Sequence, residues 1–363
     1  MARESRRQTP LSVSRWPTGG ALPGLAHGWE GGAWVALHLE ARGVTTGRGG
    51  LRAAIHRRIV SREPADGPWC SLFVGGAAVP VVAALAARGD ATFGRLLPGL
   101  IASWRAAVER TAAADVYLGR AGALLACAEI ETLAPGSVPR GLARLLGDHT
   151  GRALAALACD GDRDGDGASA PVALGMAHGA AGLLLALECG HSVFGLALDG
   201  ARRARAIERI AGERFDGPRG SAVWPEYAGG QPGTHGWCSG APGIGLALLA
   251  AHRLSGEPRY LELGRMALEG AAHFGDGKGL FCCGSAGRAQ ILIEGYRLTG
   301  SAAWLRRARA VALEKSAAPP TRVAVRSFHK GRLGWDYLWR RLLDPVLPLP
   351  GLGPLSTTAG GPP

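Results

Sequence analysis

The sequence predicts an all-α protein in which seven helical repeats close into an α/α toroid. A short Gly-x-x-Gly element followed by an apolar run returns along the chain, and stretches rich in Ala, Leu and Arg fill the intervals. Alternating patterns typical of strands are nearly absent. Helical hairpins of this length cannot bury their apolar faces alone, so they must stack on their neighbours. An open solenoid is the alternative to a closed ring.

The repeats follow one another at intervals that each fit two helices and their loops. The second helix of successive intervals is visible as a separate stretch, and these stretches are Leu51–Val60, Leu97–Arg110, Gly141–Ala158, Leu196–Ile210, Tyr260–Gly270 and Ala303–Leu313. In the second repeat Ala78 replaces the second glycine. Glycine would let the backbone turn sharply and let neighbouring helix starts approach closely. The first glycines are Gly28, Gly75, Gly119, Gly179, Gly240, Gly284 and Gly331.

No linker divides the middle of the chain, so we expect one domain over residues 24–350. The two ends, Met1–Pro23 and Pro345–Pro363, are rich in Pro and Gly. They predict a flexible basic arm over residues 1–23 and a flexible tail over residues 351–363.

Composition excludes several classes of protein. The chain has 363 residues, of which 47% are hydrophobic and 19% charged, as in compact soluble proteins. Its net charge is +12, but the basic residues are scattered and almost all arginine, with no basic run interleaved with aromatics. This pattern argues against nucleic-acid binding, although the positive potential of the protein could attract an acidic peptide. No secretory signal is visible, and the longest apolar stretch, Pro171–Leu187, is interrupted by His178 and is shorter than the ~20 residues of a membrane helix. We therefore expect a cytoplasmic protein.

In a toroid the residues that precede each Gly-x-x-Gly would converge on one mouth of the ring. Three of the seven cysteines, Cys238, Cys282 and Cys283, lie within two residues of the turns of adjacent repeats. Thiolates select zinc among common cellular ions, and three protein ligands leave a fourth position open for catalysis. We therefore predict one zinc ion at these thiols. The residues directly before the seven turns are His27, Val74, Leu118, His178, Ser239, Cys283 and Lys330.

Other cysteines and histidines offer weaker alternatives. Cys70, Cys127, Cys159 and Cys189 sit away from the turns and are expected to be buried packing residues. Burial as a small hydrophobic residue is also the alternative for the three turn cysteines. His235 and the Cys189-Gly190-His191 triplet compete as metal ligands. The stretch Asp160–Asp166 looks like a calcium loop but lacks the acidic twelfth position in either register, so we interpret it as an exposed loop.

Two polar residues near the turns could donate or accept protons as general acid or base. His178 stands in the glycine-rich stretch G-M-A-H-G-A-A-G, and an imidazole titrates near neutrality. Asp115, in D-V-Y-L-G-R-A-G, lies four residues before its turn glycine. A structural histidine and a helix-capping aspartate are the alternatives for this pair.

These stretches resemble the lanthionine synthetase C-like proteins, the cyclases of lanthipeptide biosynthesis. The resemblance covers roughly Gly24 to Pro350 and is most specific in D-V-Y-L-G-R-A-G, A-H-G-A-A-G, W-C-S-G-A-P-G-I-G and C-C-G-S-A-G. It implies an α/α toroid with one zinc ion, with Cys238 and Cys282 as cysteine ligands and Cys283 where most members place a histidine. Ser239 stands where many members carry a bulkier His or Tyr.

By the same resemblance, His178 and Asp115 match positions associated with proton transfer and substrate activation. The reaction implied is addition of a peptide cysteine thiol to a dehydroalanine or dehydrobutyrine, which gives a thioether ring. The substrate would be a dehydrated precursor peptide made by a separate dehydratase. The alternatives are a zinc-containing peptide-binding module without catalysis, the cyclase portion of a larger dehydratase-cyclase, and another α-toroid enzyme such as a prenyltransferase or glycosidase.

Overall fold

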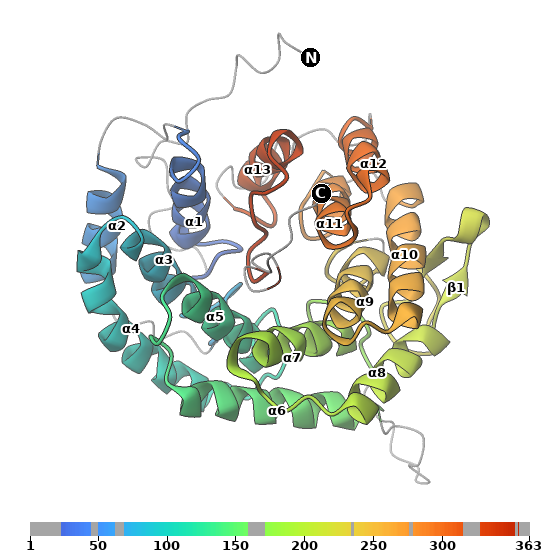
Figure 1. Ribbon diagram of the computed structural model, residues 1–363, viewed down its shortest axis with the longest axis horizontal. Helices are drawn as coiled ribbons and strands as arrows, with labels where there is room; N and C mark the ends of the chain where they lie inside the picture. Colours follow the sequence, from blue (N-terminus) through green and yellow to red (C-terminus); the bar gives the residue numbers. More distant parts are fainter. Residues whose placement is uncertain are drawn as a thin grey trace.

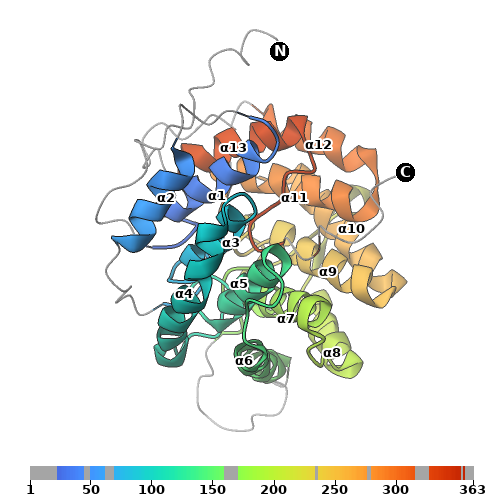
Figure 2. The ribbon, with the colours of Figure 1, turned by 60° about the vertical axis from the view of Figure 1, so that its left-hand side comes forward.

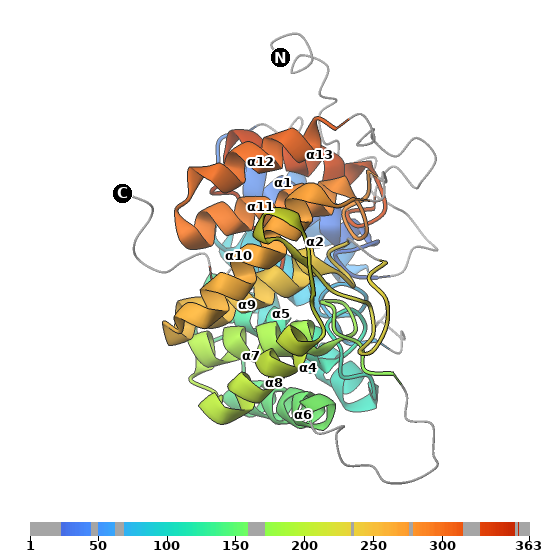
Figure 3. The ribbon, with the colours of Figure 1, turned by 90° about the vertical axis from the view of Figure 1, so that its right-hand side faces the viewer.

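The computed structural model describes residues 23–44, 50–61, 69–158, 171–233, 236–275, 279–314, 327–352 and 355. Within these residues, thirteen α-helices form two concentric layers around one axis (Figure 1). Views turned by 60° and 90° show the helices of both layers stacked side by side around that axis (Figures 2 and 3). The predicted all-α fold is therefore confirmed.

The inner layer consists of the helices that follow the repeated turns. In α7 the eleven residues from Ala180 to Gly190 are all buried, and α3, α5, α9 and α11 are buried almost as completely. Such helices need apolar or small side chains all round, because an outer helix covers one side and inner neighbours cover the flanks. The bounds are α1 Trp29–Glu40, α3 Ala78–Ala87, α5 Arg120–Leu133, α7 Ala180–Phe194, α9 Ala241–Ser255, α11 Ser285–Thr299 and α13 Arg332–Leu343.

The outer helices are amphipathic. In α4 the residues Phe93, Leu97, Ile101 and Trp104 are buried at helical spacing, while arginines and small residues between them face solvent. All six predicted second helices are helical. The bounds are α2 Leu51–Val60, α4 Ala91–Arg110, α6 Arg140–Ala158, α8 Gly200–Gly212, α10 Pro258–His273 and α12 Ala302–Ala312.

Aspartate caps explain where two outer helices begin. The carboxylate of Asp90 accepts the N–H of Thr92 at 2.9 Å, so α4 begins six residues before the predicted start. Asp199 accepts the N–H of Ala201 at 3.0 Å, so α8 begins four residues after the predicted start. Each cap satisfies an N–H group that would have no partner inside the helix.

The glycines of the repeated turn are required by close packing. In six repeats the first glycine directly precedes the inner helix and has an extended backbone with negative φ. The second glycine lies in the first helical turn against a carbonyl six residues earlier. A Cβ atom at Gly182 would overlap the carbonyl oxygen of Met176, and one at Gly287 would overlap that of Phe281. The expected close approach at the helix starts is confirmed.

A closed ring of seven backbone hydrogen bonds joins the turns. The N–H of one turn donates to the carbonyl of the next turn, all the way round, at distances of 2.9–3.2 Å. This closure excludes the open solenoid. The bonds run from Ala26 to Phe73, Val74 to Tyr117, Tyr117 to Ala177, Ala177 to Cys238, Cys238 to Cys282, Cys282 to His329 and His329 back to Ala26.

Aromatic packing completes the seam between the last repeat and the first. The indole of Trp34 on α1 is fully buried and meets the ring of Tyr337 on α13 edge-on, with centroids 5.7 Å apart. Phe328, in the turn before α13, meets the same indole at 6.4 Å. Edge-to-face pairs of this kind stabilise beyond the area they bury.

The segment after α13 packs into the ring, so a loose tail is wrong for the part of it that the structure describes. Leu347, Leu349 and Leu352 are buried, and the N–H of Gly351 donates to Oε2 of Glu129 at 2.6 Å. The other oxygen of Glu129 accepts the indole N–H of Trp34 at 2.8 Å. The leucines supply apolar surface for the core, which the Pro and Gly content of this segment concealed. The predicted arm as far as residue 22 lies outside the described residues.

Strand structure is minor, as expected. The strands β1 Phe215–Asp216 and β2 Ala222–Val223 form an antiparallel ribbon between α8 and α9. No helix in the described part of the chain is long and apolar enough to cross a bilayer.

The packing of the turn glycines gives a stability prediction. We expect Gly182→Ala to lower the free energy of unfolding by about 3 kcal/mol, because the methyl group overlaps a fixed backbone carbonyl. Gly99→Ala, in the exposed middle of α4 where a Cβ would meet no atom, should raise it by about 0.5–1 kcal/mol. Denaturant unfolding followed by circular dichroism measures both. Equal stability of the two variants would contradict the packing role.

Candidate metal and catalytic site

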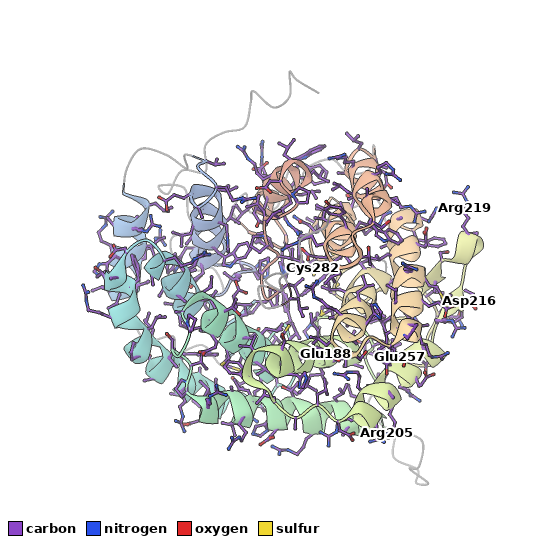
Figure 4. The ribbon with its side chains drawn as sticks, viewed as in Figure 1. Glu188, Arg205, Asp216, Arg219, Glu257 and Cys282 are labelled. Carbon is purple, nitrogen blue, oxygen red and sulfur yellow. The ribbon has the colours of Figure 1, made fainter. Side chains whose placement is uncertain are left out.

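Three cysteine thiols meet at the turns of the fifth and sixth repeats. Cys238 and Cys282 occupy the same position in their repeats, two residues before the first glycine, and the N–H of Cys238 donates to the carbonyl of Cys282 at 3.2 Å. The side chain of Cys282 hydrogen-bonds to those of both Cys238 and Cys283. Figure 4 shows Cys282 near the middle of the ring, far from the labelled residues of the outer edge. The structure thus brings together the three thiols that the sequence singled out.

The cluster favours one thiolate near neutral pH. The hydrogen bond from Cys282 lowers the pKa of the Cys238 thiol to about 6, although burial opposes this, and the hydroxyl of Ser239 donates to the same sulfur at 3.4 Å. The pKa of Cys282 is raised, chiefly because its proton is shared with its two sulfur neighbours. Cys238 therefore ionises first and Cys282 holds its proton.

Two helix N-termini lie beside the sulfurs. α9 begins three residues after Cys238, and α11 begins two residues after Cys283. The positive end of a helix dipole stabilises nearby negative charge. Cys282 is only 8% exposed, whereas Cys238 and Cys283 are partly exposed. A ligand can therefore approach the last two from solvent.

The donor set suits a thiophilic metal ion. One thiol in contact with two others, of which Cys238 has a lowered pKa, matches the sulfur-rich ligation that zinc favours. Across the described residues, no three His, Cys, Asp or Glu side chains already have the geometry of a closed metal site. The fit thus rests on the convergence of three thiols that can exchange their hydrogen bonds for a shared metal.

His178 and Asp115 form a pair beside this cluster. Nδ1 of His178 lies 3.2 Å from Oδ2 of Asp115, and Oδ1 of Asp115 accepts the N–H of Leu118 at 2.7 Å. The hydrogen bond to Asp115 raises the pKa of His178, while partial burial opposes it. The imidazole is half exposed, so its second nitrogen can exchange protons with a ligand. Asp115 caps the turn before α5 rather than the helix itself, and its other oxygen faces His178.

The sequence did not reveal every polar side chain of the site. Tyr117 and His329 occupy the same repeat position as Cys238 and Cys282, and aligning the repeats one column earlier would have found them. The hydroxyl of Tyr117 lies 2.9 Å from Nε2 of His27. His329 is fully buried, and its ring stacks on Phe281 with centroids 4.8 Å apart.

The residues directly before the turns do not all line one opening. Val74 is only 1% exposed and belongs to the core, which corrects the expectation for this position. His27 and Leu118 are partly exposed, and Lys330 is exposed. The second repeat departs because Gly75, with φ of +151°, takes a backbone shape that its counterparts do not adopt.

The other cysteines are packing residues where the structure describes them. Cys70, Cys127 and Cys189 are completely buried, and burial raises the pKa of Cys70 to about 11. His191 does not pair with Cys189 as a ligand, because its side chain is exposed and Nδ1 lies 2.8 Å from the carbonyl oxygen of Leu196. His235, Cys159 and the Asp160–Asp166 stretch lie outside the described residues.

Comparison with known proteins identifies the family. The model of the lanthionine synthetase C-like proteins matches residues 54–317, well over half of the chain, so this protein belongs to that family. Among solved structures, one titled nisin cyclase matches with a TM-score of 0.66 and 15% sequence identity. The match covers 98% of this chain and 94% of that chain. At this identity the likeness shows a shared toroidal fold.

The lowered pKa of Cys238 predicts selective alkylation. In metal-free protein, iodoacetamide should modify one thiol at a rate that rises through about pH 6 and levels off by pH 7, because the thiolate is the nucleophile. Cys238→Ser should remove this phase. Mass spectrometry of peptides locates the adduct, and the buried Cys127 serves as an unreactive internal control. A single phase rising only above pH 8 would contradict the shared-proton arrangement.

The ion pair predicts the titration of His178. Asp115→Asn should move the midpoint of the imidazole to lower pH, because the variant loses the carboxylate that raises the pKa. The pair's contribution to stability is complete below the unfolded pKa and is lost as pH rises through the folded pKa. Proton NMR of the His178 ring measures the midpoint. An unchanged midpoint in the variant would show that the two side chains do not interact in solution.

Proposed function

We propose that this protein is a zinc-dependent lanthipeptide cyclase that adds peptide cysteine thiols to dehydroalanine or dehydrobutyrine and so forms lanthionine and methyllanthionine rings. The observation that carries the proposal is the convergence of Cys238, Cys282 and Cys283 beside the His178–Asp115 pair. Membership of the lanthionine synthetase C-like family supports the same reaction class. The likeness to the structure titled nisin cyclase supports a peptide substrate.

The three cysteines would hold one zinc ion. When bound, zinc supplies the Lewis acidity that keeps an incoming substrate sulfur deprotonated at neutral pH. Because three cysteinates would outweigh the charge of such an ion, the site would leave an incoming sulfur electron-rich. Partial exposure of Cys238 and Cys283 gives that sulfur a path to the site.

His178 would supply the proton that completes the addition. Attack of sulfur on the β-carbon sends an electron pair to the carbonyl of the dehydro residue, and the resulting enolate is protonated at the α-carbon. The His178 imidazolium, favoured by Asp115, can donate this proton from its second nitrogen. Asp115 orients the ring and offsets its charge, with Leu118 N–H fixing the carboxylate.

The ring holds its catalytic groups on rigid turns, which supports catalysis by proximity. Thiol and alkene belong to one peptide, and holding them together converts a slow encounter into an intramolecular step. The substrate must arrive already dehydrated, so a separate dehydration step has to supply it. We expect this to take place in the cytoplasm.

The proposal predicts the behaviour of Cys238→Ala. Purified wild-type protein should contain one zinc per chain and form thioether rings on a dehydrated peptide. The variant should lose zinc and cyclise at least about 100-fold more slowly, since the metal contributes several kcal/mol to such steps. Cys127→Ala removes a buried thiol elsewhere and should keep both properties.

Two measurements separate the alternatives. Thiol consumption and mass spectrometry report ring formation, and metal analysis reports zinc content. Zinc binding without ring formation would favour a peptide-binding module. Equal cyclisation rates of wild type and Cys238→Ala would remove the enzymatic proposal.

A further inference from the structure

A second group of polar side chains adjoins the thiol cluster and takes no part in the chemistry assigned so far. It consists of Tyr117 in the third turn, His27 in the first and Ser327 before the seventh, so three repeats meet in it. Tyr117 lies between two histidines. Its hydroxyl bonds to His27, while its ring meets that of His178 edge-on with centroids 5.7 Å apart.

The hydrogen bonds fix the position of each proton. The Ser327 hydroxyl donates its only hydrogen to the carbonyl of Ala26 at 2.8 Å, so its oxygen can only accept from its other neighbours. It accepts the N–H of Lys330 at 3.0 Å and lies 3.1 Å from Nδ1 of His27. Nδ1 therefore carries the hydrogen, and Nε2 of a neutral ring has a free lone pair.

The hydroxyl of Tyr117 must then donate to that lone pair. The 2.9 Å contact between Tyr117 and His27 is a hydrogen bond from phenol to imidazole. The phenol oxygen keeps its own lone pairs for a second donor. Such a donor could come from a ligand at the thiols, because Tyr117 stacks on His329 with centroids 5.6 Å apart, and the carbonyl of His329 accepts the N–H of Cys282.

The pKa values of the two histidines beside Tyr117 are shifted in opposite directions. Burial, followed by the nearby charge of Lys330, lowers the pKa of His27, whereas the hydrogen bond to Asp115 raises the pKa of His178. The environment of His27 favours its neutral form, and that of His178 favours its charged form. Groups separated in this way are suited to act as base and acid in one reaction.

We propose that Tyr117 and His27 form a proton relay that accepts the thiol proton of the incoming substrate cysteine, separately from the acid pair His178–Asp115. This inference rests on the proposed cyclase function and deepens it. The S–H bond breaks and its proton passes to the phenol oxygen of Tyr117. The O–H bond of Tyr117 breaks at the same time and a new N–H bond forms at Nε2 of His27.

The step balances without another reactant. The electron pair stays on sulfur, which becomes the nucleophile, and His27 becomes an imidazolium that donates to Ser327 through Nδ1 and to Tyr117 through Nε2. Later loss of the proton to solvent resets the relay. Tyr117 touches the reacting thiol in this scheme, while Ser327 only positions His27.

The surroundings of His27 fit a base that returns to the neutral form. Lys330 from the seventh turn and the buried His329 are the titratable neighbours that act electrostatically with it. Glu30, in the first turn of α1 and three residues after His27, is buried, but it is not among the charges that shift the pKa of His27. The positive charge of Lys330 therefore opposes accumulation of the imidazolium.

The relay can be tested first without any turnover. Nitrogen NMR of histidine-labelled protein should show His27 neutral at pH 7 with the hydrogen on Nδ1, and Tyr117→Phe should change the shift of Nε2 alone. A His27 that carries its hydrogen on Nε2, or is charged at pH 7, would overturn the proposal. This result does not depend on the cyclase activity, so it stands even if the proposed function fails.

Kinetics provide the second test, on zinc-loaded full-length protein and a dehydrated peptide with one cysteine. Tyr117→Phe keeps the aromatic stacking, and His27→Gln keeps an acceptor for the phenol but cannot take its proton. Each should lower the rate at pH 6.5 by at least about tenfold. The loss should shrink by pH 9, where a free thiol of pKa near 8.5 arrives ionised. Tyr296→Phe on α11 is the matched control and should behave as wild type.

Lys330→Gln gives a decisive comparison that leaves the relay residues intact. Removal of the lysine charge should raise the NMR midpoint of His27, and the acid limb of the rate profile should move to higher pH with it. A shifted midpoint with an unshifted limb would show that His27 is not the base. Rates in Tyr117→Phe and His27→Gln equal to wild type at all pH values would also overturn the relay, whereas no ring formation by wild type would instead refute the proposed function.

Discussion

The seven hydrogen bonds that join the turns are the constraint on which the rest of the structure depends. Each turn donates its N–H to the next turn and accepts from the previous one, so the seventh repeat must meet the first. Every inner helix in the described ring begins beside this circle. Side chains at equivalent repeat positions consequently lie side by side, even when hundreds of residues separate them in the chain. The thiols and the proton-carrying side chains of the site lie at those positions.

Close packing at the helix starts explains why six of the seven repeats keep glycine at the second position of the element. The second glycine of the element lets a backbone carbonyl of the preceding loop lie directly against the helix, as at Gly182 and Gly287. The contact fixes the loop relative to the helix and thereby fixes residues such as Cys238. Precision at the site therefore derives from backbone contacts rather than from the few side chains that touch the thiols.

The turns also place ionisable groups in contrasting environments within a small region. Cys238 shares the proton of Cys282 and has a lowered pKa, His178 pairs with Asp115 and has a raised pKa, and His27 is partly buried beside Lys330 and has a lowered pKa. Addition of a thiol to an alkene needs a proton removed at sulfur and a proton delivered at carbon. Neighbouring groups tuned in opposite directions suit both transfers at one pH.

The sequence by itself determined the repeats and the all-α class, because glycine spacing and residue type are local and periodic. It singled out the three thiols, His178 and Asp115, but it did not show that the last two side chains meet. It also determined the six outer helices, whose apolar faces recur at helical spacing. Two starts were misplaced because the aspartates that cap the first turns, Asp90 and Asp199, were not used as the local start signals that they are.

Only the tertiary structure decided which turns meet. Tyr117 and His27 lie 90 residues apart, and His27 and Ser327 lie 300 apart, so no local pattern could show their hydrogen bonds. The burial of Leu347, Leu349 and Leu352 was hidden for the same reason, because their apolar surface is covered by helices from the start of the chain and its middle. The position of the proton on His27 follows from its hydrogen bonds to Ser327 and Tyr117, which form only when the ring is closed.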